Sequence, residues 1–241
     1  MKHAGKIALM VAIVGAVCAA LMLFGARLGF WEPTTGFGLY RNYLNPLGAV
    51  ITGVGLLAMI LNIIRKEKGG TIFGGVATLI GVVCLVPMIT STINPPLRSA
   101  PINDITTDTA NPPAFLVLND TREGGRTSLE YAGAKVAEIQ AAAYPDIAPL
   151  EIDLAADLAY ARALELAQDM GWEIIASDAE NHRLEATART SVFYFADDVV
   201  VVVTEQEGGS RVDMRSVSRV GRSDRGVNAA RIRDFQQQFK K

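Results

Sequence analysis

Three long apolar runs without a charge constrain this chain more than any other feature of its sequence. They cover residues 7–26, 47–64 and 71–93, and none of them contains Asp, Glu, Lys, Arg or His. A helix needs about 20 apolar residues to cross a bilayer core, so each run predicts one transmembrane helix. Because the runs hold no ionisable side chain, they offer no proton relay or ion pathway. We therefore expect residues 1–94 to form a membrane domain that anchors the protein in the lipid bilayer.

The first run has a second interpretation, as a cleaved signal peptide, because Lys2 and Lys6 give it a basic start. Its apolar stretch is longer than a usual signal core, and no small-residue cleavage site or lipobox accompanies it. We therefore predict a retained helix. Six glycines in the second and third runs either allow close helix packing or reflect the general frequency of glycine in such helices; they are Gly48, Gly53, Gly55, Gly74, Gly75 and Gly81.

Lys and Arg near the helix ends indicate the orientation, because they are retained on the cytoplasmic side. The longer first loop between runs carries Arg27 and Arg41, whereas the short second loop carries three cations, Arg65, Lys66 and Lys68. This distribution predicts a multi-pass protein of the bacterial inner (plasma) membrane, with a cytoplasmic N-terminus and a periplasmic C-terminal domain.

The chain after the third run has the pattern of one α+β domain. Residues 95–115 are proline-rich and predict a linker and extended segment that lies against the domain, and residues 116–241 predict the domain itself. Apolar residues at helical spacing predict helices over 132–143, 155–170 and 228–239. Alternating runs predict strands over 150–153, 172–177, 184–190, 199–204 and 212–218. The expected fold class is α+β: three N-terminal transmembrane helices followed by an antiparallel-sheet-plus-helices sandwich, with the helices on one face.

Charge in the second half is uneven and concentrates the candidate chemistry near the C-terminus. Residues 95–210 hold seven Lys/Arg against twenty Asp/Glu, whereas residues 211–241 hold nine against three. Arg211, Asp213, Arg215, Val217 and Arg219 share one face of a strand, which we expect to face solvent or a cleft. A glycine-containing turn and a helix start follow, and free N–H groups at a helix start attract anions.

We predict an anion-binding corner there, formed by Arg215, Ser218, Arg219, Arg222, Asp224, Asn228 and Arg231. In the alternative interpretation these arginines pair with the domain's own carboxylates and hold the strand-to-helix corner together.

Other chemistry is weakly supported. Both cysteines, Cys18 and Cys84, lie in apolar runs, so the domain has no disulfide framework or thiolate metal site. Asp197 and Asp198 read as solvated residues at a hairpin junction, and their spacing alone does not predict a metal site. No nucleophile elbow, zinc helix, phosphate loop or dinucleotide motif occurs. We predict no metal and no cofactor.

Two motifs carry a resemblance to a known family. One is Arg-Ser-x-Ser-Arg-x-Gly-x-Ser-Asp-x-Gly-x-Asn-x-x-Arg-Ile over residues 215–232, and the other is Asp-Ile-Thr-Thr-Asp over 104–108 ahead of Pro-Pro-Ala-Phe at 112–115. Together they resemble the signature of the domain of unknown function 1499 family, over roughly residues 97–239. The resemblance implies no established activity.

Two classes of function fit these patterns. The first is a membrane-anchored periplasmic binding or scaffold module, whose partner is an anionic small molecule or an envelope protein. The alternative is an envelope hydrolase or transferase acting on an anionic substrate, with Arg215, Arg219 and Arg222 as clamps and Asp198 or Asp224 as acid or base. The predicted location and the acidic total charge argue against nucleic acid as a partner.

Overall fold

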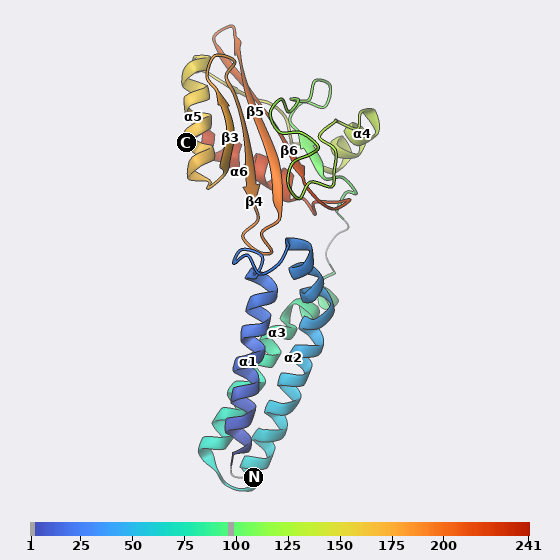
Figure 1. Cartoon of the computed structure of the whole chain (residues 1–241), viewed down its shortest axis with the longest axis vertical. Helices are drawn as coiled ribbons and strands as arrows, with labels where there is room; N and C mark the ends of the chain where they lie inside the picture. The colour runs from blue at the N-terminus through green and yellow to red at the C-terminus, as the bar shows by residue number, and fades with distance from the viewer. Residues whose placement is uncertain (1–2, 96–98) are drawn as a thin grey trace. The chain divides into compact units, whose positions relative to one another are not determined.

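The protein is described here from a computed structural model, which covers residues 3–95 and 99–241. Lys2 and the linker residues 96–98, which entered the sequence analysis, lie outside the described residues. The chain divides into an N-terminal unit of three helices and a C-terminal α+β unit (Figure 1). Each unit is described by itself.

The N-terminal unit confirms the three predicted apolar helices. They are α1 (Ala4–Phe24), α2 (Pro33–Ile64) and α3 (Lys68–Ile93), each long and apolar enough to cross a membrane. The second helix begins well before its apolar run, so Arg41 lies in a helix. We had expected Arg41 in the first loop. Pro33 suits the first turn because its missing N–H would have had no partner there. Polar residues then continue the helix ahead of its apolar part.

Some of the glycines in these helices lie at close contacts between backbones. A Cβ added to Gly74 would lie 2.5 Å from the backbone nitrogen of Met59, and one added to Gly81 would lie 2.5 Å from that of Thr52. Nothing lies within 4 Å of a Cβ added to Gly53. Close packing through small residues therefore accounts for part of the glycine set and not for all of it.

The C-terminal unit is built on an antiparallel sheet, as the sequence predicted, which has six strands instead of the five expected (Figure 1). The strand order is β1-β6-β5-β4-β3, and the short strand β2 pairs with β6 as well. The strands are β1 (Asp104–Thr106), β2 (Leu150–Ile152), β3 (Glu173–Asp178), β4 (Arg183–Arg189), β5 (Ala196–Gln206) and β6 (Gly209–Ser218). Strand β1 belongs to the predicted extended segment, which thus joins the sheet edge by pairing with β6.

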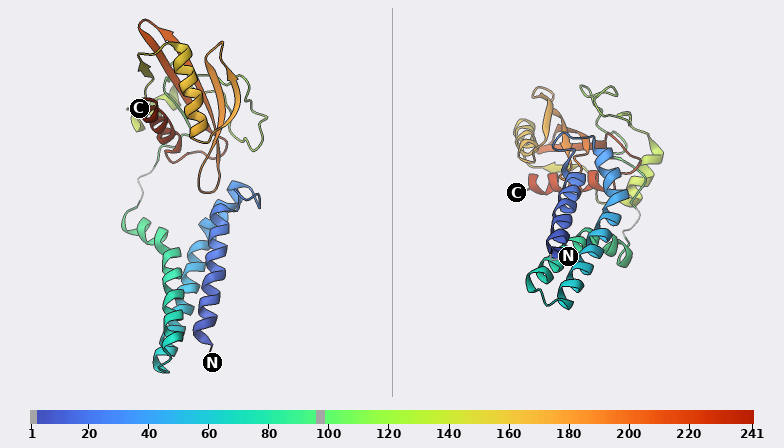
Figure 2. Two further views of the ribbon diagram at one scale, coloured as in Figure 1. Left: turned by 90° about the vertical axis from the view of Figure 1, so that its left-hand side faces the viewer. Right: turned by 60° about the horizontal axis from the view of Figure 1, so that its bottom comes forward.

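Helices α5 (Ala156–Asp169) and α6 (Val227–Phe239) cover one face of this sheet (Figure 2). Helix α5 packs through buried alanines at helical spacing, which let its backbone lie close to the valines of β5. Helix α6 contributes Phe235, whose ring stacks on Trp172 with 5.5 Å between centroids. This layer is the main hydrophobic core. Helix α4 (Ala134–Ala143) lies beside β1, where the Gln140 side chain bonds the backbone of Thr106.

The opposite face of the sheet is covered by residues 107–133, a stretch without helix or strand that we call the covering segment. It packs Leu118 and Leu129 on Val217 of β6. The expectation that this strand face meets solvent or a cleft was therefore wrong for Arg215 and Val217, which are each only 1% exposed, whereas Arg211 and Asp213 at the other end of the same face line a pocket. The alternation of side chains along β6 was predicted correctly, but alternation does not reveal that an irregular segment covers the polar face.

A fragment of residues 99–241 should fold without the three N-terminal helices. Its main core cluster and the smaller cluster under the covering segment are both made from residues of the C-terminal unit. We expect a soluble, monodisperse protein with a single cooperative thermal transition, measured by circular dichroism together with size-exclusion chromatography. Aggregation in mild buffer without such a transition would contradict an independent domain.

Candidate functional site

Arg215, the first arginine of the predicted corner, is buried and forms hydrogen bonds within the domain. Its Nε and Nη2 atoms donate to the two carboxylate oxygens of Asp104, at 2.9 and 2.8 Å. Further hydrogen bonds run to the backbone oxygens of Leu129 at 2.8 Å and Pro113 at 3.2 Å. Burial raises the pKa of Asp104, although the Arg215 guanidinium acts in the opposite direction. Arg215 thus ties β6 to β1 and to the covering segment.

The Arg215 guanidinium also contacts two aromatic rings of the covering segment. Its central carbon lies 5.4 Å from each ring centroid, in positions that favour a cation–π interaction; the rings are those of Phe115 and Tyr131. These contacts leave the side chain only 2% exposed. A ligand has no open approach to this guanidinium.

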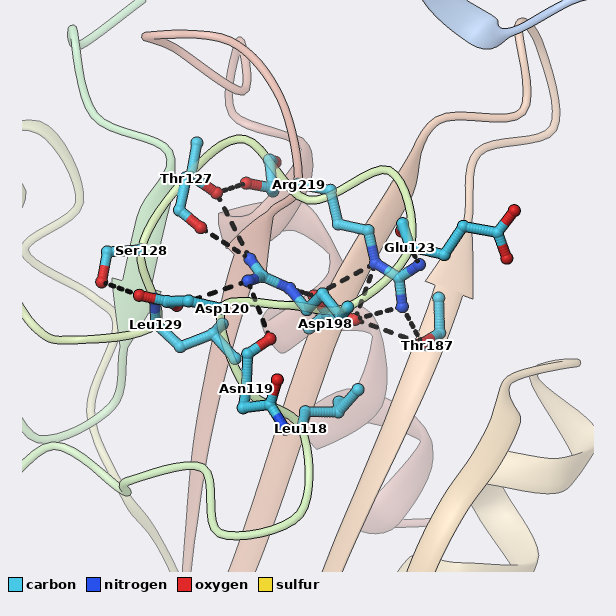
Figure 3. Close-up of polar contacts among 12 residues, drawn as sticks. Leu118, Asn119, Asp120, Glu123, Thr127, Ser128, Leu129, Thr187, Asp198 and Arg219 are labelled. Carbon is cyan, nitrogen blue, oxygen red and sulfur yellow. Dashed lines mark hydrogen bonds and ion pairs between the residues drawn. The ribbon is translucent and has the colours of Figure 1, made fainter.

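Asp198 of β5 lies between two guanidinium groups at the end of the sheet (Figure 3). Arg219 donates to Asp198 Oδ1 from Nη2 at 2.8 Å and from Nε at 3.0 Å. Arg122 of the covering segment donates from Nε to the other carboxylate oxygen. Other donors of the two groups reach Thr187 Oγ1, 2.8 Å from Arg219 Nη2, the backbone oxygen of Glu123, 2.8 Å from Arg219 Nη1, and that of Thr127, 3.0 Å from Arg122 Nη2. This fully buried carboxylate fastens residues 119–128 to the sheet.

Asp197, the preceding residue, points to the helix-covered face because successive strand residues alternate. Its Oδ2 accepts from Nη2 of Arg231 in α6 at 2.5 Å. Arg231 Nη1 also donates to Ser216 Oγ at 2.9 Å and Asn228 Oδ1 at 2.6 Å. Two consecutive aspartates therefore bind the layers on opposite faces of the sheet. Asp197 binds the terminal helix, and Asp198 binds the covering segment.

Asn228 links three parts of the chain at the start of α6. Its amide nitrogen donates to Ser218 Oγ at 3.0 Å and to the backbone oxygen of Asn103 at 2.9 Å, while its oxygen accepts from Ser216 Oγ at 2.8 Å. The strand end, the helix and the residue before β1 are thereby held together.

The helix start that we predicted to attract an anion already holds a carboxylate of this chain. Asp224 accepts from the backbone nitrogens of Asn228 at 2.7 Å and Gly226 at 3.0 Å. Burial raises the pKa of Asp224, and these N–H donors oppose the shift. The turn needs glycine at 226, where φ is +84°. An anionic ligand would have to displace Asp224 from this position.

Arg222 differs from the other six predicted residues. It is exposed, and it makes no hydrogen bond or ion pair to any residue that the structure describes. The structure therefore brings six of the seven residues into the internal network of this corner and leaves Arg222 at the surface. Whether the corner binds an anion stays a prediction, and Arg222 is the arginine that such a ligand could reach.

The interpretation of Asp197 and Asp198 as solvated junction residues was wrong. Both lie inside β5, which begins at Ala196, and they are 2% and 0% exposed. Sequence reasoning also missed Arg122, which sits in a polar loop like many solvated arginines. The available signal was the charge imbalance: an arginine-rich end and an acid-rich body imply ion pairs between distant segments.

Residues 104–239 match the sequence model of a family described as protein of unknown function (DUF1499). The matched region covers more than half of the chain and contains every ion pair of this corner. No curated protein matches the chain.

Proposed function

The chain belongs to the DUF1499 family, proteins of unknown function, and we propose that it is a membrane-anchored binding or scaffold module whose C-terminal domain works in the periplasm. The observation that carries this proposal is the internal pairing of the arginine corner. Buried arginines that each pair with a carboxylate of the same chain hold the domain together. Few charged groups of the corner are then available for catalysis. The three apolar helices supply the anchor.

An envelope hydrolase or transferase is the weaker alternative. Its proposed acid or base would be Asp198, which is fully buried between two arginines, or Asp224, which binds the start of α6. A general acid or base must come within hydrogen-bond reach of the substrate. Neither carboxylate meets that requirement without displacing its partners, which favours a binding role.

The proposed orientation is tested by reporters fused after Lys241. Because three spans follow a cytoplasmic N-terminus, alkaline phosphatase at this position should be active, and a reporter that matures only in the cytoplasm should be silent. The same reporters placed after Lys66, in the loop between α2 and α3, should give the opposite result and serve as the control. An inactive phosphatase after Lys241, with an active cytoplasmic reporter there, would reverse the topology.

The proposed binding role is tested separately, by chemical cross-linking of the full chain in native membranes. A scaffold module should give a discrete cross-linked species that is lost when the C-terminal domain is removed by a protease site placed after Pro95. A small-molecule module should give no such species. A cross-link that persists without the domain would assign partner contact to the helices and contradict the proposal.

A further inference from the structure

A pocket of about 370 Å³ lies within the C-terminal unit, on the sheet face that carries the covering segment. Val202 of β5 forms part of its wall and is paired in register with Arg183 of β4 on one side and Asp213 of β6 on the other. Asp108 and Asn111 of the covering segment line it as well. Its size is that of a small-molecule site. None of the seven residues of the predicted anion corner lines it.

Arg183 carries unused hydrogen-bond donors beside this pocket. Its Nε and Nη2 atoms are buried, and no acceptor in the structure bonds them. The nearest carboxylate oxygen, Oε1 of Glu185, is 3.6 Å from Nε, which is too long for a hydrogen bond. Buried donors without a partner are rare in folded proteins because losing water without replacement is costly. Arg183 is therefore in need of an acceptor oxygen.

Glu185 cannot readily become that acceptor, because the covering segment already binds its carboxylate. Three consecutive backbone N–H groups donate to it, from Leu116 at 2.5 Å, Val117 at 3.2 Å and Leu118 at 2.7 Å. A carboxylate held by several N–H groups is stabilised in place. Turning it toward Arg183 would release those N–H groups.

The charges around the pocket favour a neutral ligand over an anion. Arg183 and Arg211 face the carboxylates of Asp108 and Asp213, and Glu185 adds a third. Arg211 is already engaged, with Nε 2.7 Å from Asp213 and Nη2 2.6 Å from Asp108. Two cations beside three anions give little net attraction for a further negative charge. The pocket therefore has hydrogen-bond donors without a partner, those of Arg183, but no excess of positive charge.

The remaining lining fits a ligand with several hydroxyl groups. A hydroxyl both donates and accepts, so it can pair with amide, hydroxyl and carboxylate side chains alike. Asn111, Thr204 and Gln206 line the pocket and are exposed, so their polar groups are open to a ligand. Val202 and Pro113 add an apolar surface for the C–H face of a sugar ring.

We propose that this pocket binds a neutral saccharide unit, with a ring hydroxyl or acetamido oxygen accepting from the Arg183 guanidinium. Arg183 lines the pocket and its side chain is 15% exposed. The proposal requires its guanidinium to turn on binding, so that an N–H group that is buried in the structure reaches the ligand. The inference rests on the proposed binding function and names its ligand class.

The test uses the full chain in micelles of a detergent without a sugar headgroup, with N-acetylglucosamine as the probe. Saturation-transfer NMR should show saturable binding to the wild type. Arg183→Met should weaken it at least tenfold, and Asn111→Ala should weaken it measurably. Arg189→Met is the matched control: it makes the same substitution further along β4, outside the pocket lining, and should bind like the wild type.

Several outcomes would overturn the proposal. They are no saturable binding by the wild type, equal binding by Arg183→Met, or Arg183-dependent binding of acetate or inorganic phosphate without binding of the sugar. If Arg183→Met loses its near-ultraviolet circular dichroism, Asn111→Ala decides: weaker binding supports the pocket, and unchanged binding refutes it. The topology reporters test the periplasmic location of the C-terminal domain independently of the sugar titration. A failed titration therefore refutes the saccharide site and does not refute the proposed anchored domain.

Discussion

Asp198→Asn should lower the free energy of unfolding by about 3–5 kcal/mol, the cost of removing one partner from a buried ion pair. The substitution keeps the shape of the side chain and removes the charge that two guanidiniums share. Arg219, whose side chain is only 11% exposed, would then be left without a carboxylate, and Arg122, only 4% exposed, would keep only the exposed carboxylate of Asp120 at 3.5 Å. Urea unfolding of the full chain in micelles, followed by near-ultraviolet circular dichroism, measures the change.

Asp120→Asn is the matched control for this experiment. Asp120 belongs to the same cluster, with Oδ1 3.5 Å from Arg122 Nη1, but its side chain is 58% exposed. Water screens such a charge, so its loss should change stability little. If Asp198→Asn is no more destabilising than Asp120→Asn, the Asp198 carboxylate does not hold the covering segment, and the assignment of the corner to structure is wrong.

Replacing the exposed Arg222 tests the anion hypothesis. If the corner binds an anion at Arg222, replacing Arg222 by Ala should remove phosphate binding and leave stability unchanged, because this side chain has no partner among the described residues. Phosphate binding that depends instead on Arg219 would require Asp198 to be displaced. A phosphate titration of the full chain, read beside the unfolding curves, separates these cases.

The elements that could be predicted from the sequence are those set by periodicity. The apolar runs identified the three long apolar helices, and the alternating runs located β3 to β6 to within a few residues. Apolar residues at helical spacing located helix α5 but did not identify its buried face, since Leu158 is 61% exposed whereas Ala159, Ala163 and Ala167 are buried. Helix α6 was predictable because Ile232, Phe235 and Phe239 share a face, and all three are buried. These signals are local, so a single sequence carries them in full.

The covering segment was not predictable in the same way. It has no period, and it is held by contacts between residues far apart in the sequence, such as Asp104 with Arg215 and Arg122 with Asp198. The sequence contains both members of each pair but not which carboxylate meets which arginine. For that reason the sequence alone leaves both alternatives open, a ligand site and an internal ion-pair network.

Arg215→Met should have an effect as large as that of Asp198→Asn, about 3–5 kcal/mol, because it leaves the Asp104 carboxylate buried without a partner. Methionine fills most of the volume and retains the contact with the rings of Phe115 and Tyr131, so the loss reports charge more than packing. Arg222→Met, the same substitution at an exposed arginine, should stay within about 0.5 kcal/mol of the wild type.

Adding Asp104→Leu to Arg215→Met should then recover much of the stability, since an apolar pair can replace a buried ion pair. Urea unfolding of the wild type, Arg215→Met, Asp104→Leu and the double mutant gives the coupling energy. A double mutant as unstable as the sum of its single mutants would show that the two side chains act independently, and would contradict the ion pair as the link between β1, β6 and the covering segment.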